Sequence, residues 1–342
     1  MATAHDVPIW AMMTDIAALQ AALKSALAPV AGDRATPRLD GARASIILDV
    51  TGLDADDRYA LEGLVRETAV ALPGIDEVRV AQTSQRIRRL TIAVASGKGG
   101  VGKSTVSANL AIALQQLGRR VGLVDADIYG PSQPKLMGVE GTKPTARDKV
   151  LQPVPTPYGV SLLSMGQLVA DDQAIAWRGP MAAGALGQLM DANWGLADTI
   201  VIDLPPGTGD VQLTMIQKHR PTGAVIVSTP QDLALIDARR AIDLFAKAGV
   251  PVIGIVENMA GYACPACGEV SDPFGRGGAE AAAAELDLPF LGRIPLDIAI
   301  RTASDGGMPP VTGTGPERDA FMVVATHVKT WLDRGGNNAT YQ

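Results

Sequence analysis

Short apolar runs rich in β-branched residues recur along the chain after residue 90, and helical patterns separate them. The runs are Leu90–Ala95, Val121–Val124, Val160–Ser164, Thr199–Leu204, Ala224–Ser228, Val252–Val256 and Phe290–Ile294. Nearly continuous apolar strands are typical of sheets that are covered by helices on both faces. The helical patterns include Lys103–Leu117, Ala182–Asp191 and Leu233–Ala248. This alternation predicts an α/β fold with a doubly wound, mostly parallel sheet.

The first 82 residues show a different pattern of apolar and polar positions. Ile16–Leu27 and Asp56–Leu72 show the apolar spacing of amphipathic helices, and Ala44–Val50 and Ile75–Val80 are short strand-like runs. We therefore expect a small α+β domain over 1–82, a polar linker over 83–89, the main domain over 90–335 and a flexible tail over 336–342. Residues 144–157 and 306–315 are expected to be loops, and the amphipathic stretch 318–334 is expected to pack on the sheet.

Composition and charge reduce the number of functions that the chain could have. The chain has 342 residues, 47% of them apolar, which is enough for a sizeable core. Its net charge is −6, and the one short basic cluster, Arg86–Arg89, is weak evidence for nucleic-acid binding, so we expect no nucleic-acid partner. We find no uninterrupted apolar run of the length that a membrane span needs, and no signal-peptide pattern at the N-terminus. We therefore expect a cytoplasmic protein without a membrane partner.

One glycine-rich segment carries the strongest chemical signal. It fits G-x-x-x-x-G-K-S, follows an apolar strand directly and opens a helix, which is the context of a phosphate loop. In such loops backbone N–H groups converge on phosphate, and the positive end of the helix favours the anion. We expect Lys103 to reach the β- and γ-phosphates of ATP and the Ser104 hydroxyl to bind Mg²⁺. The predicted nucleotide-binding loop comprises Gly97, Lys98, Gly99, Gly100, Val101, Gly102, Lys103, Ser104 and Thr105.

Aspartates follow two of the predicted strands and should lie beside this loop at the carboxyl edge of the sheet. Asp127 is our candidate for orienting or activating the attacking water. Asp203 is placed on the Mg²⁺ side, and Asp125 is expected to support Mg²⁺ through water. Helix capping is the alternative explanation for any aspartate at a strand end. The segment Pro205–Asp210 suits a switch that orders when the γ-phosphate is present.

Asn258 follows the strand Val252–Val256 closely. A side-chain amide at this edge of the sheet can read the edge of the adenine base. A turn-forming asparagine is the alternative.

The only two cysteines, Cys264 and Cys267, have C-x-x-C spacing. In a reducing compartment this spacing indicates metal or redox chemistry more than a structural disulfide. A tetrahedral Zn²⁺ or an iron–sulfur cluster normally needs four protein ligands, and His5, His219 and His327 are distant in sequence. Two chains related by a two-fold axis would supply four thiolates. A [4Fe–4S] cluster, a shared zinc ion and a redox dithiol are the alternatives.

Taken together, these motifs resemble the Mrp/ApbC group of P-loop ATPases that carry iron–sulfur clusters, a group close to the MinD, ParA and nitrogenase iron-protein groups. The matching stretches, in family order, are Ser96–Thr105, Asp125–Ser132, Trp177–Met181, Asp203–Asp210, Thr229–Ala234, Val256–Met259, Cys264 with Cys267, and Phe274–Gly278.

The resemblance implies a homodimer with nucleotide at the subunit interface. It implies that Lys98, the signature lysine of the deviant Walker class, crosses to the partner's phosphates and acts in catalysis with Lys103 and Asp127. It also implies a labile [4Fe–4S] cluster bridged by Cys264 and Cys267 of both chains. Cluster delivery to apoproteins would be coupled to ATP binding and slow hydrolysis. Residues 1–82 lie where the family often has a MIP18-like domain, and we expect a docking module there.

Two other functions stay open at this point. A spatial switch of the MinD/ParA kind would share the phosphate loop, although membrane recruitment would favour a basic amphipathic terminal helix. A zinc-stabilised ATPase switch without a cluster would use the same cysteine pair.

Overall fold

The computed structural model describes residues 9–85, 87–128, 130–168, 179–264 and 266–335. The chain divides into two compact units, Met1–Ile87 and Arg88–Gln342. Several sequence expectations fall outside the described residues: His5, Arg86, Tyr129, Trp177 with Arg178, Pro265 and the tail 336–342.

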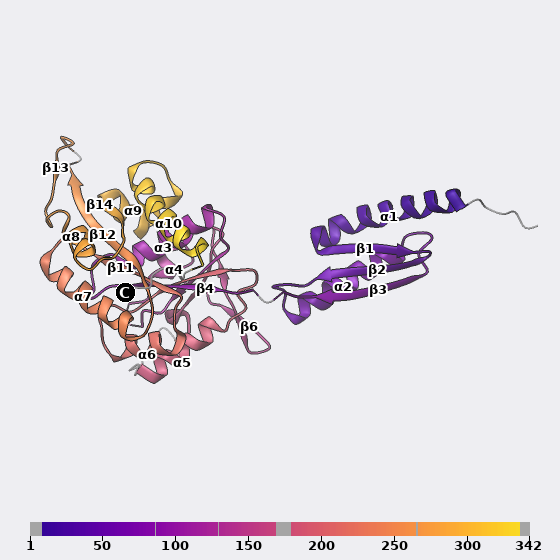
Figure 1. Cartoon of the computed structure of the whole chain (residues 1–342), viewed down its shortest axis with the longest axis horizontal. Coiled ribbons are helices and arrows are strands. Elements are labelled where there is room, and N and C mark those ends of the chain that lie inside the picture. Colours follow the sequence, from indigo (N-terminus) through magenta and orange to yellow (C-terminus); the bar gives the residue numbers. More distant parts are fainter. Residues whose placement is uncertain (1–8, 86, 129, 169–178, 265, 336–342) are drawn as a thin grey trace, which may run out of the picture. The chain divides into compact units, whose positions relative to one another are not determined.

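The first unit is a layer of two helices on a three-stranded sheet (Figure 1). Strand β2 alternates buried and exposed side chains, and its buried residues Ala44, Ile46 and Leu48 pack under Leu23 of one helix and Val65 of the other. This period-2 pattern is what a half-covered sheet requires. Strands β1 and β2 are antiparallel, and β3 lies parallel to β2. The elements are α1 (Ile9–Ala31), β1 (Ala35–Asp40), β2 (Arg43–Asp49), α2 (Ala55–Val70) and β3 (Glu77–Thr83).

The second unit is built on a large sheet whose core of seven strands is parallel. The seven runs expected from the sequence form these strands, in the spatial order β14-β12-β11-β4-β10-β5-β9. Their bounds are β4 (Leu90–Ala95), β5 (Val121–Asp125), β9 (Ser161–Ser164), β10 (Thr199–Asp203), β11 (Gly223–Ser228), β12 (Val252–Ala263) and β14 (Phe290–Leu296). The predicted doubly wound α/β fold is therefore confirmed.

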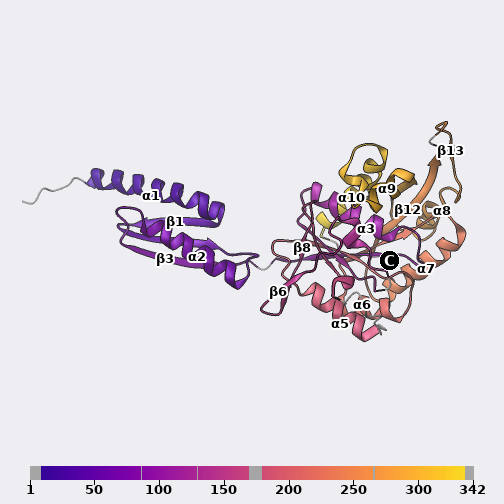
Figure 2. The same cartoon turned by 180° about the vertical axis from the view of Figure 1, so that it is seen from behind.

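Helices cover both faces of this sheet, as Figures 1 and 2 show from opposite sides. One face packs on α3 and α10, whose buried side chains include Leu110, Ile112 and Phe321. The other packs on α5, α6, α7 and α8, through residues such as Leu186, Met215 and Phe245. The helices are α3 (Lys103–Gln116), α4 (Gln133–Leu136), α5 (Gly179–Met190), α6 (Asp210–His219), α7 (Asp232–Lys247), α8 (Gly278–Glu285), α9 (Ile298–Asp305) and α10 (Pro316–Asp333).

The C-terminal amphipathic stretch packs on the sheet as expected. In α10 the residues Val324, Ala325 and Val328 are buried together with residues of α3 and β14. This interior contact accounts for the apolar face of the helix. Among the described residues, no helix combines the length and the apolar character that crossing a bilayer would require.

The expectation of a loop over 144–157 is wrong, because this segment contains three short strands. Strands β6 (Thr145–Arg147) and β7 (Val150–Gln152) form an antiparallel pair, and β8 (Val154–Pro155) pairs with β9. These strands have little signature in the sequence: all three residues of β6 are exposed, so neither an apolar run nor a buried alternation marks it. Strand β1, which contains Pro37, also went unpredicted and lies at an edge of its sheet, where proline is tolerated.

Candidate functional site

The glycine-rich loop connects β4 to α3 at the carboxyl edge of the sheet. Gly102 adopts φ +78°, in the left-handed region, directly before the first helical residue. Gly97 passes close to α7, since a Cβ at this position would lie 2.0 Å from the Asp237 carbonyl oxygen. Gly99 and Gly100 are exposed at the tip of the loop. The glycines thus serve both the turn and the close approach of two backbones.

Lys103 forms a buried ion pair with Asp203. The lysine Nζ lies 2.6 Å from Asp203 Oδ1 and 4.0 Å from Asp127 Oδ2. Lys103 is 5% exposed and Asp203 is fully buried. The two residues are 100 positions apart in sequence, but β10 and β4 are parallel neighbours. Their carboxyl ends therefore meet at the same edge.

Two further side chains hold Asp203, and sequence analysis did not find them. Ser107 Oγ donates to Asp203 Oδ1 at 2.9 Å, and Gln133 Nε2 donates to Asp203 Oδ2 at 2.8 Å. Ser107 stands one helical turn after Lys103, so the i, i+4 spacing was a usable signal. No local pattern pointed to Gln133, which lies in another segment.

Asp125 is buried and accepts three hydrogen bonds from the protein. The donors are the backbone N–H groups of Asp127 and Gln133, each at 3.1 Å, and Ser164 Oγ at 3.0 Å. Burial, reinforced by the charge of Asp203, raises the pKa of Asp125 to about 7. Its carboxylate thus organises the loop that follows β5 and contacts the first residue of α4.

Asp127 lies at the rim of the same cluster. It is 8% exposed, and the backbone N–H of Gly130 donates to its Oδ1 at 3.3 Å. Ser104 and Thr105 occupy the first turn of α3, and the Ser104 carbonyl accepts a hydrogen bond from Gln133 Nε2 at 2.9 Å. The structure therefore brings Lys103, Asp125, Asp127 and Asp203 together around the start of α3.

Asn258 lies within β12 and packs on the glycine-rich loop. Its Nδ2 donates to the Val101 carbonyl at 2.8 Å, and a Cβ on Gly102 would lie 2.1 Å from the same nitrogen. The side chain is 7% exposed. This amide supports the loop backbone. Its reading of adenine remains a prediction.

The signature lysine and the segment after β10 also lie at this edge. Lys98 Nζ is 3.5 Å from Gln231 Oε1 of the same chain. In the segment 205–210, the Gly207 N–H donates to the Ser96 carbonyl at 3.0 Å, and Asp210 opens α6. A backbone hydrogen bond thus connects the expected switch to Ser96, the residue directly before the loop.

The cysteines form a tight turn at the end of β12. The Gly268 N–H donates to the Cys264 carbonyl, and the Cys264 N–H donates to the Glu269 carbonyl, both at 2.8 Å. The chain then returns as β13 (Val270–Ser271), antiparallel to β12. We call 262–271 the cysteine hairpin. The backbone N–H groups of Ala266 and Cys267 lower the pKa of the Cys264 thiol, and the Cys267 thiol adds to this effect.

The cysteine hairpin offers two metal ligands. Cys264 is partly exposed and Cys267 is exposed. Among the described residues, no group of three or more His, Cys, Asp or Glu side chains could hold a metal ion. His219 Nε2 and His327 Nδ1 each lie within hydrogen-bond distance of a backbone carbonyl, of Ala183 and of Leu291. A four-ligand centre on this pair therefore needs donors from outside the described chain.

Glu257 is a buried acid beside Asn258 that was assigned no role from sequence. It accepts hydrogen bonds from the Ala279 N–H at 2.8 Å and the Gly277 N–H at 3.3 Å, and pairs with Arg293 Nε at 3.1 Å. These contacts fasten the start of α8 to β12. A carboxylate within an apolar strand was the available signal, because such a group needs partners.

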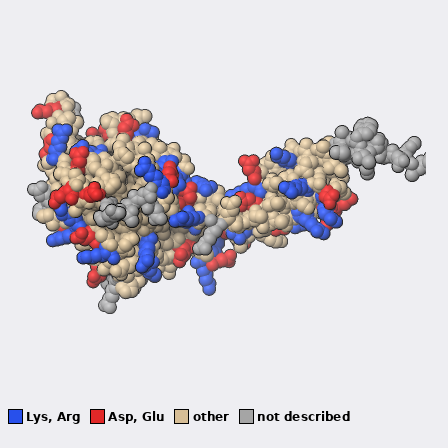
Figure 3. Space-filling view, in the orientation of Figure 1, with Lys and Arg blue, Asp and Glu red and all other residues tan. Residues whose placement is uncertain are grey.

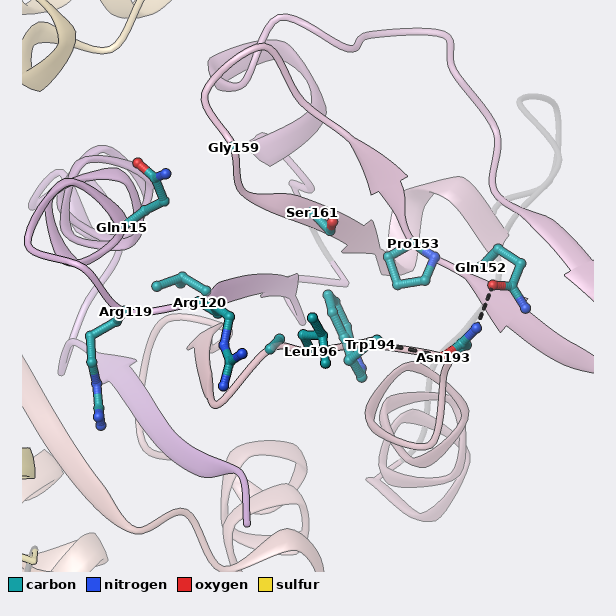
Figure 4. A pocket seen from close by; sticks show the side chains of 13 residues that line it. Gln115, Arg119, Arg120, Gln152, Pro153, Gly159, Ser161, Asn193, Trp194 and Leu196 are labelled. Carbon is teal, nitrogen blue, oxygen red and sulfur yellow. Dashed lines mark hydrogen bonds between the residues drawn. The ribbon is translucent and has the colours of Figure 1, made fainter. Parts of the chain in front are cut away.

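A separate cavity of about 340 Å³ lies at the opposite, amino-terminal edge of the sheet (Figure 4). It is lined by Val121 and Ser161, which begin β5 and β9, and by Trp194. Asn193 hydrogen bonds to Gln152 at its rim. None of the predicted site residues lines this cavity.

Comparison with known proteins agrees with this geometry. The family model described as "NUBPL iron-transfer P-loop NTPase", of the ParA group, matches residues 87–329. A protein of Methanococcus maripaludis named iron-sulfur cluster carrier protein is 48% identical over 246 residues, which are 71% of this chain and 84% of the relative. A protein of Deinococcus radiodurans with the same name is 45% identical over 289 residues, covering 84% and 77%.

Solved structures share the fold. A nucleotide-binding protein from Archaeoglobus fulgidus in complex with ADP superimposes with a TM-score of 0.59 at 41% identity, covering 66% of this chain and 89% of that one. The cell division ATPase MinD of Pyrococcus furiosus gives a TM-score of 0.52 at 25% identity, covering 70% and 98%.

Proposed function

Because the chain belongs to the ParA family of NUBPL iron-transfer P-loop NTPases, we propose that it delivers iron–sulfur clusters to apoproteins as an ATP-hydrolysing homodimer. The family and the fold expected from the sequence are confirmed by the match over 87–329 and by the ADP-bound neighbour. The relatives named iron-sulfur cluster carrier protein support the assignment of the cargo.

The nucleotide part of the proposal assigns ATP to the loop 97–105. Lys103 would turn from Asp203 to the β- and γ-phosphates, and the backbone N–H groups of the loop would cradle them. Lys98 would reach the phosphates bound by the partner subunit. Asp127, at the rim beside Lys103, would orient the attacking water. Slow turnover suits this assignment, since Asp127 is the one side chain proposed to act on the water.

Mg²⁺ is a hard cation that prefers oxygen ligands. The Ser104 hydroxyl and the Asp203 carboxylate provide such oxygens next to the loop, so the residues fit the ion. Bound Mg²⁺ would neutralise charge that develops on the phosphates. Asp125 would contribute indirectly, because its hydrogen bonds hold the segment that carries Asp127.

The cluster is the cargo, and we assign it to Cys264 and Cys267 of two chains. Four thiolates complete the ligand set of a [4Fe–4S] cluster. The lowered pKa of the Cys264 thiol favours the thiolate, which is the form that binds metal. Exposure of the pair is consistent with a cluster that is handed to another protein.

One observation carries the proposal: strand β12 touches the nucleotide loop and then carries the cysteine hairpin. Asn258 donates to Val101 of the loop, and Cys264 follows six positions later. Between them the pairing with β14 is irregular, and Met259 and Gly261 have positive φ. A rearrangement of the loop on ATP binding can therefore reach the cysteines through one short, bent segment.

The surface charge and the first unit bear on which other partners the protein has. On the face that Figure 3 shows, Lys and Arg are interspersed with Asp and Glu, which supports an absence of nucleic-acid binding by this face. We propose that residues 1–82 dock recipient proteins, that no membrane partner is needed, and that the protein acts in the cytoplasm.

Anaerobic reconstitution with iron and sulfide tests the cargo. We expect about four irons and four sulfides per dimer, with a broad visible absorption band. Cys264→Ala and Cys267→Ala should each abolish the band, because each removes two of the four thiolates of the dimer. The loaded protein should also restore an apo-ferredoxin.

Ser271→Ala, in the same hairpin, serves as the control and should load normally. Zinc bound in place of iron, or a spectrum that the cysteine variants leave unchanged, would overturn the carrier proposal. Zinc is a real competitor here, since the Cys264–Gly268 turn presents two thiols as zinc knuckles do.

A further inference from the structure

We propose that Gln133 is a positioning residue for ATP hydrolysis, which keeps the Asp203 carboxylate in place when Lys103 turns to the nucleotide. This inference rests on the proposed ATP hydrolysis and assigns a role to a side chain that the phosphate-loop motif does not contain.

Gln133 joins three segments of the site. It is the first residue of α4 and is fully buried. Its Nε2 donates to Asp203 Oδ2 at 2.8 Å and to the Ser104 carbonyl at 2.9 Å. Its backbone N–H donates to Asp125 Oδ2 at 3.1 Å. One residue thus connects the end of β10, the start of α3 and the loop after β5.

The orientation of this amide is fixed by its surroundings. Both partners of Nε2 are acceptors, a carboxylate and a backbone carbonyl, so a flipped amide would place oxygen against oxygen. Oε1 is buried and accepts no hydrogen bond from the described residues. Retaining a buried acceptor without a donor costs stability. The two bonds made by Nε2 are therefore the reason for a glutamine at this position.

Asp203 needs this donor most when nucleotide is bound. Its Oδ1 now contacts Lys103 Nζ at 2.6 Å and Ser107 Oγ at 2.9 Å. When Lys103 moves to the phosphates, Ser107 and Gln133 are the described donors that remain, one on each carboxylate oxygen. Without Gln133 the buried carboxylate could rotate about its terminal torsion, because that torsion has a broad minimum. The carboxylate that would hold Mg²⁺ would then no longer keep one orientation.

The test compares Gln133→Met with the wild type. Methionine has a similar length and volume, so it fills the buried space but cannot donate. We expect kcat for ATP to fall about 10- to 100-fold, as for the loss of one hydrogen bond to a charged group. KM for ATP should stay within about threefold, as should the Kd for ATP measured in EDTA, since the loop and Lys103 are unchanged.

Gln116→Met is the matched control. Gln116 Nε2 also donates to a backbone carbonyl, that of Val311, but it lies at the far end of α3. This variant should keep kcat within about twofold. Combining Gln133→Met with Ser107→Ala should lower kcat by more than the product of the single effects, because both side chains hold Asp203.

A Gln133→Met protein with wild-type kcat overturns the inference, and so does a loss of kcat equal to that of Gln116→Met. If the methionine variant does not fold, Gln133→Asn, whose shorter amide cannot span both acceptors, is measured instead and must show the same loss of kcat. A wild-type chain that binds ATP but never hydrolyses it overturns the proposed ATPase activity itself. This failure is seen in the wild-type protein alone, so it is distinguished from a failure of the Gln133 inference.

Discussion

The nucleotide loop contacts strand β12, and the cysteine hairpin forms the end of that strand, yet the two regions differ in burial and in the number of partners of their functional side chains. At the loop, Lys103, Asp125 and Asp203 are buried and each is held by several partners. At the hairpin, Cys267 is exposed and no third metal ligand lies among the described residues. Burial raises the pKa of Asp125, whereas backbone N–H groups lower the pKa of Cys264.

The difference in burial between the nucleotide loop and the cysteine hairpin suits two different roles. The charged groups beside the nucleotide loop are brought together within one chain, where burial strengthens each charge pair. In the proposed assignment the cysteine pair supplies half of a four-ligand set, and its metal chemistry would then depend on a second copy of the chain. The segment between Asn258 and Cys264 connects the buried site to the solvent-accessible cysteines along one strand.

The largest expected effect separates the two regions. Lys103→Gln removes the charge that would contact phosphate but keeps a donor for Asp203. We expect ATP affinity to fall at least about 30-fold, because loss of one buried charged partner typically costs about 2 kcal/mol or more. Iron and sulfide loading of the hairpin should be unchanged. Equilibrium binding and iron analysis check this, with Lys329→Gln on α10 as the control.

Joint loss of nucleotide binding and cluster loading in folded Lys103→Gln protein would contradict the separation of the two sites.

A second prediction concerns pH at the buried edge. The folded chain holds a proton on Asp125 up to about pH 7, whereas the unfolded chain releases it near pH 4. The folded state therefore binds more protons between these values, and this group's contribution to stability is full below about pH 4 and lost as pH rises through about 7.

We expect the free energy of unfolding of the second unit to fall by about 2 kcal/mol between pH 5 and pH 8 from this group. Asp125→Asn should flatten that dependence, while Asp243→Asn, at an exposed position of α7, should keep it. Urea unfolding at several pH values, followed by tryptophan fluorescence, measures both. An identical pH slope in Asp125→Asn and wild type would show that the burial of this carboxyl has no such consequence.

The smallest expected effect concerns the connection between the nucleotide loop and the cysteines through β12. Asn258→Ala leaves the Val101 carbonyl without its donor and should cost about 1 kcal/mol of stability. ATP binding and cluster loading should each persist, but the acceleration of cluster transfer by ATP should fall toward none. Transfer to an apo-ferredoxin with and without ATP measures this ratio.

Asn193→Ala, at the opposite edge of the sheet, is the control for that experiment. An Asn258→Ala protein in which ATP accelerates transfer as in wild type would remove β12 as the path between the sites.

Much of this architecture could be predicted from local pattern. Seven apolar runs became the seven parallel strands, because a strand buried on both faces has few polar alternatives. The phosphate loop was readable because glycine positions, a following helix and a lysine must occur at fixed spacing. The C-x-x-C spacing of the cysteines was also readable from the sequence. Two thiols with no nearby third ligand in the sequence cannot complete a four-ligand metal centre alone.

The tertiary structure alone decided which distant side chains meet. It paired Lys103 with Asp203 across 100 positions and placed Gln133 between Asp203, Ser104 and Asp125. It also directed the Asn258 amide to the loop backbone and made strands of part of 144–157. Hydrogen bonds and ion pairs require a few ångströms of separation, and that separation is set by strand order in the sheet. The local sequence specifies the strands, but their order comes only from packing the whole chain.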